Sequence, residues 1–175
     1  MVATGCRGNP TSTDPFAGLG GFFFNTATPT PGSRLNEVQA GIGIVRVSDS
    51  SEPPDVLRAQ SFVLHCVEER SCSHLDPRTK LHFQDLGSVK RGEMTRLRVQ
   101  WDRENHRFIF RQGDDPEVFA LYTMSDTAPA SDPHKTLTVL HSVANCTATP
   151  RPVALVEVSP DDVLVDESAA PGDAR

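Results

Sequence analysis

The strongest pattern in the chain is a two-residue alternation of apolar and polar side chains between residues 95 and 111. Leu97, Val99 and Trp101 occupy alternate positions, and the positions between them are polar. A polar segment follows, after which the chain returns through the apolar run 107–111. Because a period of two is that of a β-strand, the segment predicts a β-hairpin with Trp101 turned towards the core.

Further runs of strand length lie on both sides of this hairpin. We expect strands at residues 21–25, 37–47, 57–68, 81–83, 118–122, 136–144, 153–158 and 163–165. No segment has the three-and-four spacing of an amphipathic helix, and Pro- and Gly-containing turns separate the runs. About nine strands of this kind predict an all-β fold, an antiparallel two-sheet β-sandwich or jelly roll.

Glycines occupy an unusual place in the run 37–47. Apolar residues alternate on one side of this strand, whereas Gly41 and Gly43 fall on the other side. A glycine inside a strand is typical of a bulge or of a close approach by another backbone. We therefore expect one of these two features beside Gly41 and Gly43.

The composition is that of one globular domain. Of 175 residues, 37% are hydrophobic and 23% are charged, which is enough for one sizeable core. Residues 1–19, rich in Thr, Pro and Gly, predict a flexible leader, and residues 20–165 form the sandwich domain. The acidic, small-residue segment 166–175 predicts a disordered tail.

Charge and hydropathy exclude two classes of partner. The formal net charge is -6, and the Lys and Arg residues are dispersed, so we expect no binding to nucleic acid. No stretch approaches the roughly 18 consecutive apolar residues of a membrane helix. We therefore expect no membrane span.

Four cysteines bear on the compartment. Cys66 and Cys72 flank a short polar loop at the end of an apolar run, where a disulfide is sterically reasonable. Their spacing is not that of a Cys-x-x-Cys zinc site, so the pair favours the disulfide over a metal site. Cys6 and Cys146 either form a second bridge or are unrelated thiols.

A disulfide points to an extracellular or periplasmic location. Residues 1–14 lack the charged start and apolar block of a secretory signal, which is either absent or already removed.

The predicted hairpin resembles the back-sheet hairpin of concanavalin A-like lectin and glucanase sandwiches, including laminin G-like modules. The residues that carry this resemblance are Leu-Arg-Val-Gln-Trp-Asp at 97–102, followed after five residues by Phe-Ile-Phe at 108–110. The wider series, from Gly-Phe-Phe-Phe-Asn at 21–25 to Asn-Cys-Thr-Ala at 145–148, resembles uncharacterised secreted bacterial members of that superfamily. The resemblance implies a β-sandwich and glycan binding. Because such sandwiches commonly have more strands, either an N-terminal part is missing or a partner completes the sheet.

Carboxylates do not form the pattern that a sandwich glycosidase requires. That pattern is Glu-x-Asp-x-x-Glu, because an acid and a nucleophile must flank one glycosidic bond, and the chain lacks it. Asp102 and Glu104 lie at a predicted hairpin tip, where acidic residues are ordinary turn formers. Glu157 and Asp161 are separated by a proline.

Histidines and serines give no hydrolase motif either. The six histidines are scattered, and no serine lies in a Gly-x-Ser-x-Gly elbow. His141, among apolar neighbours, is best interpreted as a hydrogen-bonded strand residue. The pairs Asp114–Asp115 and Asp161–Asp162 allow Ca²⁺ at loop ends but lack the spacing of a dedicated loop, so solvated turns are favoured.

The sequence therefore predicts a module without catalytic, metal or cofactor residues, which binds a ligand or a surface. A glycan is the leading ligand through the resemblance, although the chain has one Trp and one Tyr for stacking on sugars, and Trp101 is predicted in the core. The alternative is a structural subunit that self-associates through strand edges. A third hypothesis is a hydrolase of glycans or esters.

Overall fold

A computed structural model of the protein describes residues 14–46, 52–53, 55–70, 72 and 76–142. Several predictions concern residues outside these ranges: the strands at 153–158 and 163–165, the tail 166–175, the residues Cys6, Cys146, Glu157, Asp161 and Asp162, and leader residues 1–13.

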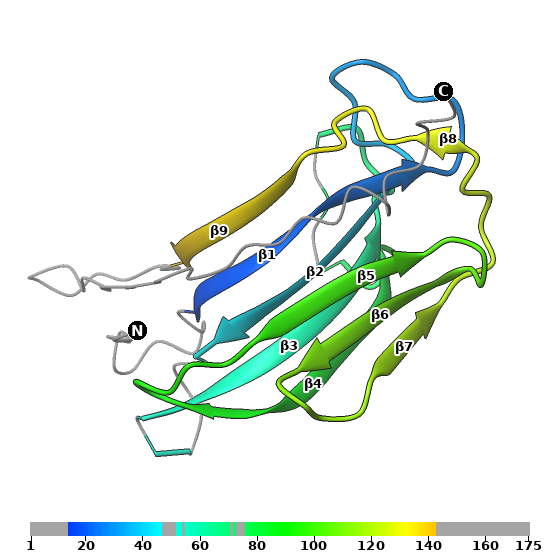
Figure 1. Ribbon diagram of the computed structural model, residues 1–175. Coiled ribbons are helices and arrows are strands. Elements are labelled where there is room, and N and C mark those ends of the chain that lie inside the picture. The colour runs from blue at the N-terminus through cyan, green and yellow to red at the C-terminus, as the bar shows by residue number, and fades with distance from the viewer. Residues whose placement is uncertain (1–13, 47–51, 54, 71, 73–75, 143–175) are drawn as a thin grey trace, which may run out of the picture.

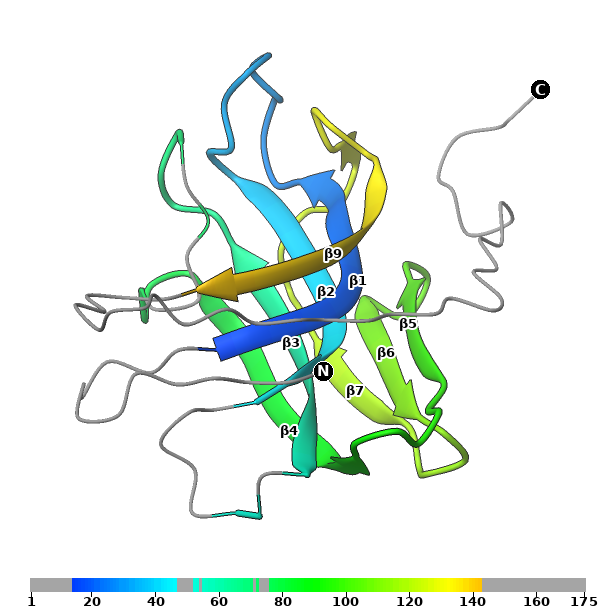
Figure 2. The same cartoon turned by 90° about the vertical axis from the view of Figure 1, so that its left-hand side faces the viewer.

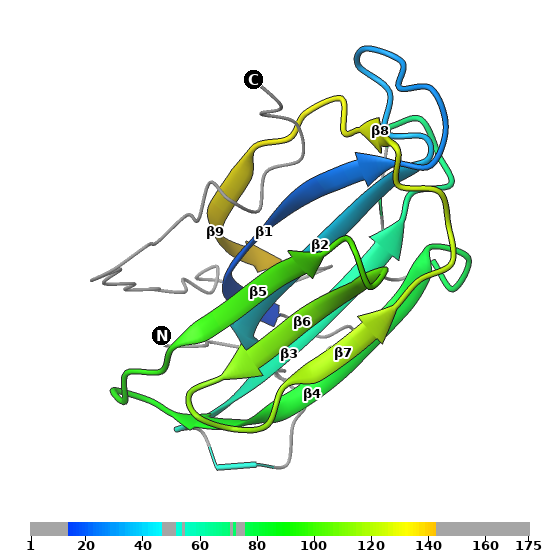
Figure 3. The same cartoon turned by 45° about the vertical axis from the view of Figure 1, so that its right-hand side comes forward.

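The described chain forms two antiparallel β-sheets that face each other, as Figures 1 and 3 show. The larger sheet contains β1 (Asp14–Asn25), β2 (Glu37–Val45), β3 (Val56–His65), β4 (Lys80–Lys90), β8 (Ala128–Pro129) and β9 (Lys135–Ser142). Its order is β4-β3-β2-β1-β8, and β9 also pairs with β1. The smaller sheet has the order β5-β6-β7, with β5 (Leu97–Asp102), β6 (Arg107–Gln112) and β7 (Val118–Leu121). The predicted all-β, two-sheet class is confirmed. None of the described residues belongs to a helix that is long and apolar enough to cross a membrane.

Strand β1 begins earlier than the sequence pattern predicts. It starts at Asp14, so the predicted leader is wrong for residues 14–19, which pair with β9 throughout and with β2 from Phe16 onwards. Asp14, Pro15 and Gly18 give this segment a low strand propensity. Backbone hydrogen bonds to the neighbouring strands stabilise the segment despite this low propensity, because such bonds depend on position in the sheet rather than on side chains.

The predicted hairpin is confirmed. Strands β5 and β6 pair with Trp101 opposite Phe108 and Val99 opposite Phe110, and the Trp101 side chain is buried. At the tip, the Asp102 carboxylate accepts hydrogen bonds from Asn105 Nδ2 and from Arg107 Nε, the latter at 2.7 Å. These bonds close the turn.

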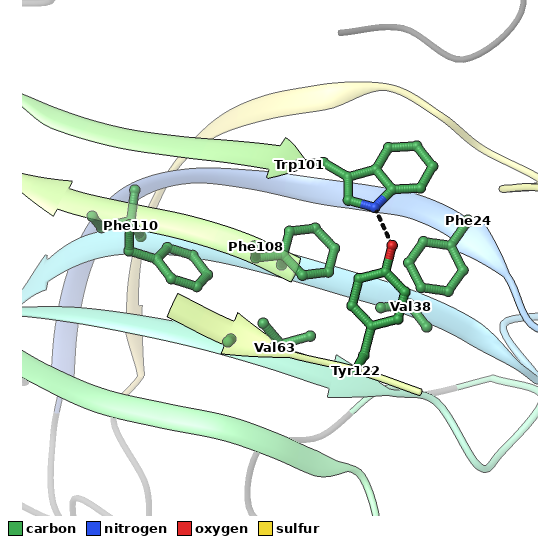
Figure 4. Packing of buried hydrophobic residues seen from close by; sticks show 10 residues of the cluster. Phe24, Val38, Val63, Trp101, Phe108, Phe110 and Tyr122 are labelled. Atoms are coloured by element: carbon green, nitrogen blue, oxygen red, sulfur yellow. Dashed lines mark hydrogen bonds between the residues drawn. The ribbon is translucent and has the colours of Figure 1, made fainter. Parts of the chain in front are cut away.

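Aromatic rings fill the space between the sheets (Figure 4). A bulge between Phe22 and Phe24 breaks the alternation of β1, and both Phe23 and Phe24 pack into this core. Trp101 Nε1 donates to the Tyr122 hydroxyl at 2.7 Å, and that hydroxyl donates to Asp126 Oδ2 at 2.7 Å. The polar atoms of both large rings are therefore satisfied in the core.

The predicted disulfide between Cys66 and Cys72 is present, with the two Cα atoms 4.7 Å apart. Cys66 is fully buried, and its N–H donates to the carbonyl of Glu37. The bridge therefore closes the loop after β3, and the Cys66 hydrogen bond attaches this loop to the start of β2.

The smaller sheet covers only part of the larger one. In the view from the side of β9, that strand crosses in front of β1 and lies away from β5–β7 (Figure 2). The side chains of Leu137 and Val139 on β9 are accordingly 46% and 47% exposed. Both lie on the face of the larger sheet that carries the core.

Candidate functional site

The face of the larger sheet opposite the core, which we call the outer face, gathers aromatic and polar side chains from several strands. On β2 this face carries Gln39, Gly41 and Gly43, because Val38, Ala40 and Ile42 point into the core. The pairing register sets two rows across the sheet. They are Phe83, Phe62, Gly41 and Gly20 in one row and Asp85, Gln60, Gly43 and Gly18 in the next.

Four glycines, Gly18, Gly20, Gly41 and Gly43, form a block without side chains in the middle of the outer face, which we call the glycine floor. A Cβ atom on Gly41 would lie 2.5 Å from Cζ of Phe62. A Cβ atom on Gly18 would lie 2.5 Å from Cζ of Phe16. The two phenyl rings therefore lie across the floor, in space that only glycine leaves open.

This arrangement contains one of the two features expected beside Gly41 and Gly43. The register of β2 with β3 is unbroken at both residues, and the side-chain atoms that approach them belong to Phe62 and Phe16. The predicted close approach of another backbone is present, because a Cβ atom on Gly43 would lie 2.8 Å from the Ala17 carbonyl oxygen and one on Gly41 would lie 3.1 Å from that of Leu19. The aromatic rings approach the same glycines in addition. Residues opposite each other on the same face of a sheet lie close enough for a ring to reach the neighbouring strand.

Polar side chains border the rings. Gln60 and Asp85 are opposite each other in the row beside Phe62. Arg58 pairs with Glu52 at 2.5 Å and lies 3.6 Å from Asp85. Phe83 at the edge of the row is 42% exposed. The outer face thus combines accessible ring surface with hydrogen-bonding groups.

A pocket of about 270 Å³ opens at the end of the larger sheet where Phe22 lies. Its lining residues are Gly32, Ser33, Arg34, Ser131 and Asp132. The loop after β1 and the segment between β8 and β9 meet here (Figure 1). The Arg34 guanidinium lies 4.1 Å from the centre of the Phe22 ring, and Phe22 pairs with Gln39 on the outer face. The pocket therefore adjoins the outer face.

Electrostatic contacts fix the pocket wall. Asp132 accepts hydrogen bonds from His134 Nδ1 at 2.6 Å and from Arg34 at 3.3 Å, and these two bonds lower the pKa of its carboxyl. Lys135 Nζ donates to the carbonyl of Phe22, and burial lowers the pKa of this ammonium group. Below the pocket, the buried Glu37 carboxylate accepts from Ser131 N–H at 2.7 Å and from its hydroxyl at 2.5 Å.

The acidic residues considered from the sequence lie elsewhere. Asp102 lies at the end of β5, where its bond from Arg107 lowers the pKa of the carboxyl, and Glu104 is exposed at the hairpin tip. Asp114 and Asp115 lie exposed in the turn after β6. Among the described residues, no three His, Cys, Asp or Glu side chains gather where they could hold a metal ion.

The histidines with described side chains have separate partners. His65 lies 3.1 Å from the Thr26 hydroxyl, and His82 lies 3.0 Å from the Ser61 hydroxyl, and burial lowers the pKa of both imidazoles. Ser61 is fully buried, so its hydroxyl is closed to a substrate. His141 lies in β9, and its side chain is outside the described part.

Sequence reasoning missed the phenylalanines of the outer face. Phe16, Phe62 and Phe83 lie on three different strands, and nothing in their local sequence marks them as a group. One signal was available: glycines alternate in both Gly18-Leu19-Gly20 and Gly41-Ile42-Gly43. Two adjacent strands of this kind leave room for rings from their neighbours.

Comparison of the chain with models of known protein families, with curated proteins and with solved structures found no match in any of the three.

Proposed function

We propose that this protein is an extracellular or periplasmic, non-catalytic module that binds glycan chains on the outer face of its larger sheet. The observation that carries the proposal is the pair of rings, Phe16 and Phe62, which lie across the glycine floor. A ring held along a sheet offers its apolar face to solvent, and the C–H face of a pyranose is a suitable partner for such a surface.

The polar border supports the same ligand class. Gln60 supplies both a donor and an acceptor, and Asp85 supplies acceptors, in the row next to Phe62. Sugar hydroxyls need both kinds of group. A few polar groups beside an apolar surface are typical of small-ligand sites, where the apolar surface contributes affinity and the polar groups fix orientation.

The location rests on the disulfide. A bridge between Cys66 and Cys72 persists in oxidising compartments and is uncommon in the reducing cytosol. Glycans on cell surfaces and in extracellular material are ligands of the same compartments.

Alanine in place of Phe62 or Phe83 is expected to weaken glycan binding by about tenfold, because each change removes ring surface from the outer face. A glycan array identifies the ligand, and titration calorimetry with that ligand measures the change. Phe119→Ala is the matched control: its side chain is 46% exposed, against 42% for Phe83, but it lies on β7 in the smaller sheet. A blank array, or an equal loss in the control, would contradict the proposal.

A second candidate function, self-association, is favoured by the free edge of β5. Within the described residues β5 pairs with β6 alone. The Arg96 carbonyl accepts from Gly113 N–H on the β6 side. The backbone groups of Leu97, Val99 and Trp101 therefore point to the other, free edge. An extended segment of a second copy that paired there would also cover Leu137 and Val139.

This second function predicts dimers or larger assemblies in light scattering after size-exclusion chromatography. Leu137→Lys is expected to shift them towards monomer, because a charge on the exposed apolar strip opposes its burial. Leu121→Lys, at a 77% exposed position on β7, is the control that should leave the assembly unchanged. A monomer at every concentration would exclude self-association.

A further inference from the structure

We propose that the pocket beside Phe22 recognises a carboxylate on the bound sugar, so that the outer face selects acidic glycans over neutral ones. This inference rests on the proposed glycan binding and names the class of glycan. Its central group is the guanidinium of Arg34, which lines the pocket and lies over the Phe22 ring.

The position of Arg34 is fixed by its backbone and by the ring below it. Its N–H donates to the carbonyl of Glu69 at 2.6 Å, and its carbonyl accepts from Glu37 N–H at 3.1 Å. The guanidinium centre lies 4.1 Å from the Phe22 ring centre, a favourable stacking geometry for arginine. A ligand therefore meets a guanidinium whose place is set in advance.

The donors of Arg34 are only partly used. The side chain is 32% exposed, and its side-chain hydrogen bond within the described residues is one 3.3 Å contact with Asp132. A guanidinium has five N–H donors in a planar fork that matches a carboxylate with two parallel bonds. The geometry leaves enough donors for such a bidentate contact from the pocket.

The carboxylates beside Arg34 are already engaged, and Glu37 below the pocket accepts hydrogen bonds from Ser131. The one carboxylate of the pocket lining, Asp132, is already bonded to both Arg34 and His134. Lys135 lies opposite Gly21 on the core face of the sheet, with its Nζ atom 4.2 Å from the Phe23 ring centre, and is not part of the pocket lining. The guanidinium of Arg34 is therefore the cation that the pocket lining offers to an anionic ligand.

The dimensions also fit one substituent of a longer chain. Phe22 follows Gly20 by two residues, which places it about 7 Å along the strand from the row of Phe62. A volume of about 270 Å³ is small for a ligand pocket and suits a carboxylate with part of one ring. Neighbouring sugar rings would lie on the glycine floor.

Oligogalacturonate and its methyl ester test the inference, because esterification removes the charge and keeps the sugar chain. We expect the acid form to bind about tenfold more tightly in titration calorimetry. Arg34→Gln should reduce this preference, whereas Asp132→Asn should increase it, since the substitution removes a carboxylate that competes for Arg34. General damage to the loop would reduce the preference in both variants.

Arg78→Gln is the matched control, because Arg78 is an exposed arginine paired with Asp76 and Glu68 on another loop. It should leave the preference unchanged. Equal binding of the two forms, or a reduced preference in Asp132→Asn, would overturn the inference. If an array shows only neutral glycans bound, the carboxylate assignment fails while glycan binding stands. If the array is blank and neither form binds, both proposals fail.

Discussion

Replacement of Phe108 by alanine is expected to lower the free energy of unfolding by about 3–5 kcal/mol. The ring is fully buried between the sheets. It lies 4.9 Å from the Phe23 ring and 5.7 Å from the Tyr122 ring, measured between ring centres. Removal leaves a cavity among rings that are held by both sheets, so the surroundings close it only in part.

Chemical denaturation followed by tryptophan fluorescence measures this change, since Trp101 lies in the same cluster. Phe119→Ala removes an equal ring from the exposed side of the same sheet and should change stability little. Phe108→Leu keeps most of the volume and provides a measurable variant if the alanine protein does not fold. Similar small losses for Phe108→Ala and Phe119→Ala would contradict the described core.

A single methyl group on Gly18 should lower the free energy of unfolding by about 3 kcal/mol, at the upper end of the effects of overpacking. The added Cβ would lie 2.5 Å from the Ile42 carbonyl oxygen and 2.6 Å from Cα of Gly43. Both atoms belong to the backbone of β2, which is hydrogen-bonded on its two sides. The strands must move apart to admit the methyl group.

Gly41→Ala is the informative comparison. Its Cβ would meet Cζ and Cε1 of Phe62 at 2.5 and 2.8 Å, the far end of a side chain that can rotate away, and the backbone oxygen of Leu19 at a wider 3.1 Å. We therefore expect a smaller loss of stability, and Phe62→Ala in the same chain should remove part of it. The measurement is again chemical denaturation. A loss in Gly18→Ala no larger than that in Gly41→Ala would show that the glycine floor is not packed as described.

The extent of several strands could not be predicted from local patterns. Strand β4 covers Lys80–Lys90, whereas the apolar run indicates only 81–83. The remaining residues are mainly exposed or polar at this sheet edge, and they are held by pairing with β3. Pairing of this kind depends on a partner distant in sequence, so local propensity does not reveal it.

The candidate site could not be predicted from the sequence, for a related reason. Phe16, Phe62 and Phe83 meet on one face only because β4, β3, β2 and β1 are adjacent in that order and in that register. A shift of one residue in any pair would turn a ring to the other face. The pocket at Arg34 likewise needs the segment before β9 to return beside the loop after β1.

Four features could be predicted from the sequence: the β class, the hairpin of β5 and β6, the burial of Trp101 and the bridge between Cys66 and Cys72. Each follows from neighbours along the chain, through alternation or through a short loop. The tertiary fold sets which strands are adjacent, where the phenyl rings and Arg34 lie, and which strand edges are unpaired among the described residues. The physical reason is that strand order and register are set by contacts between distant segments, and one chain's local pattern is compatible with many such pairings.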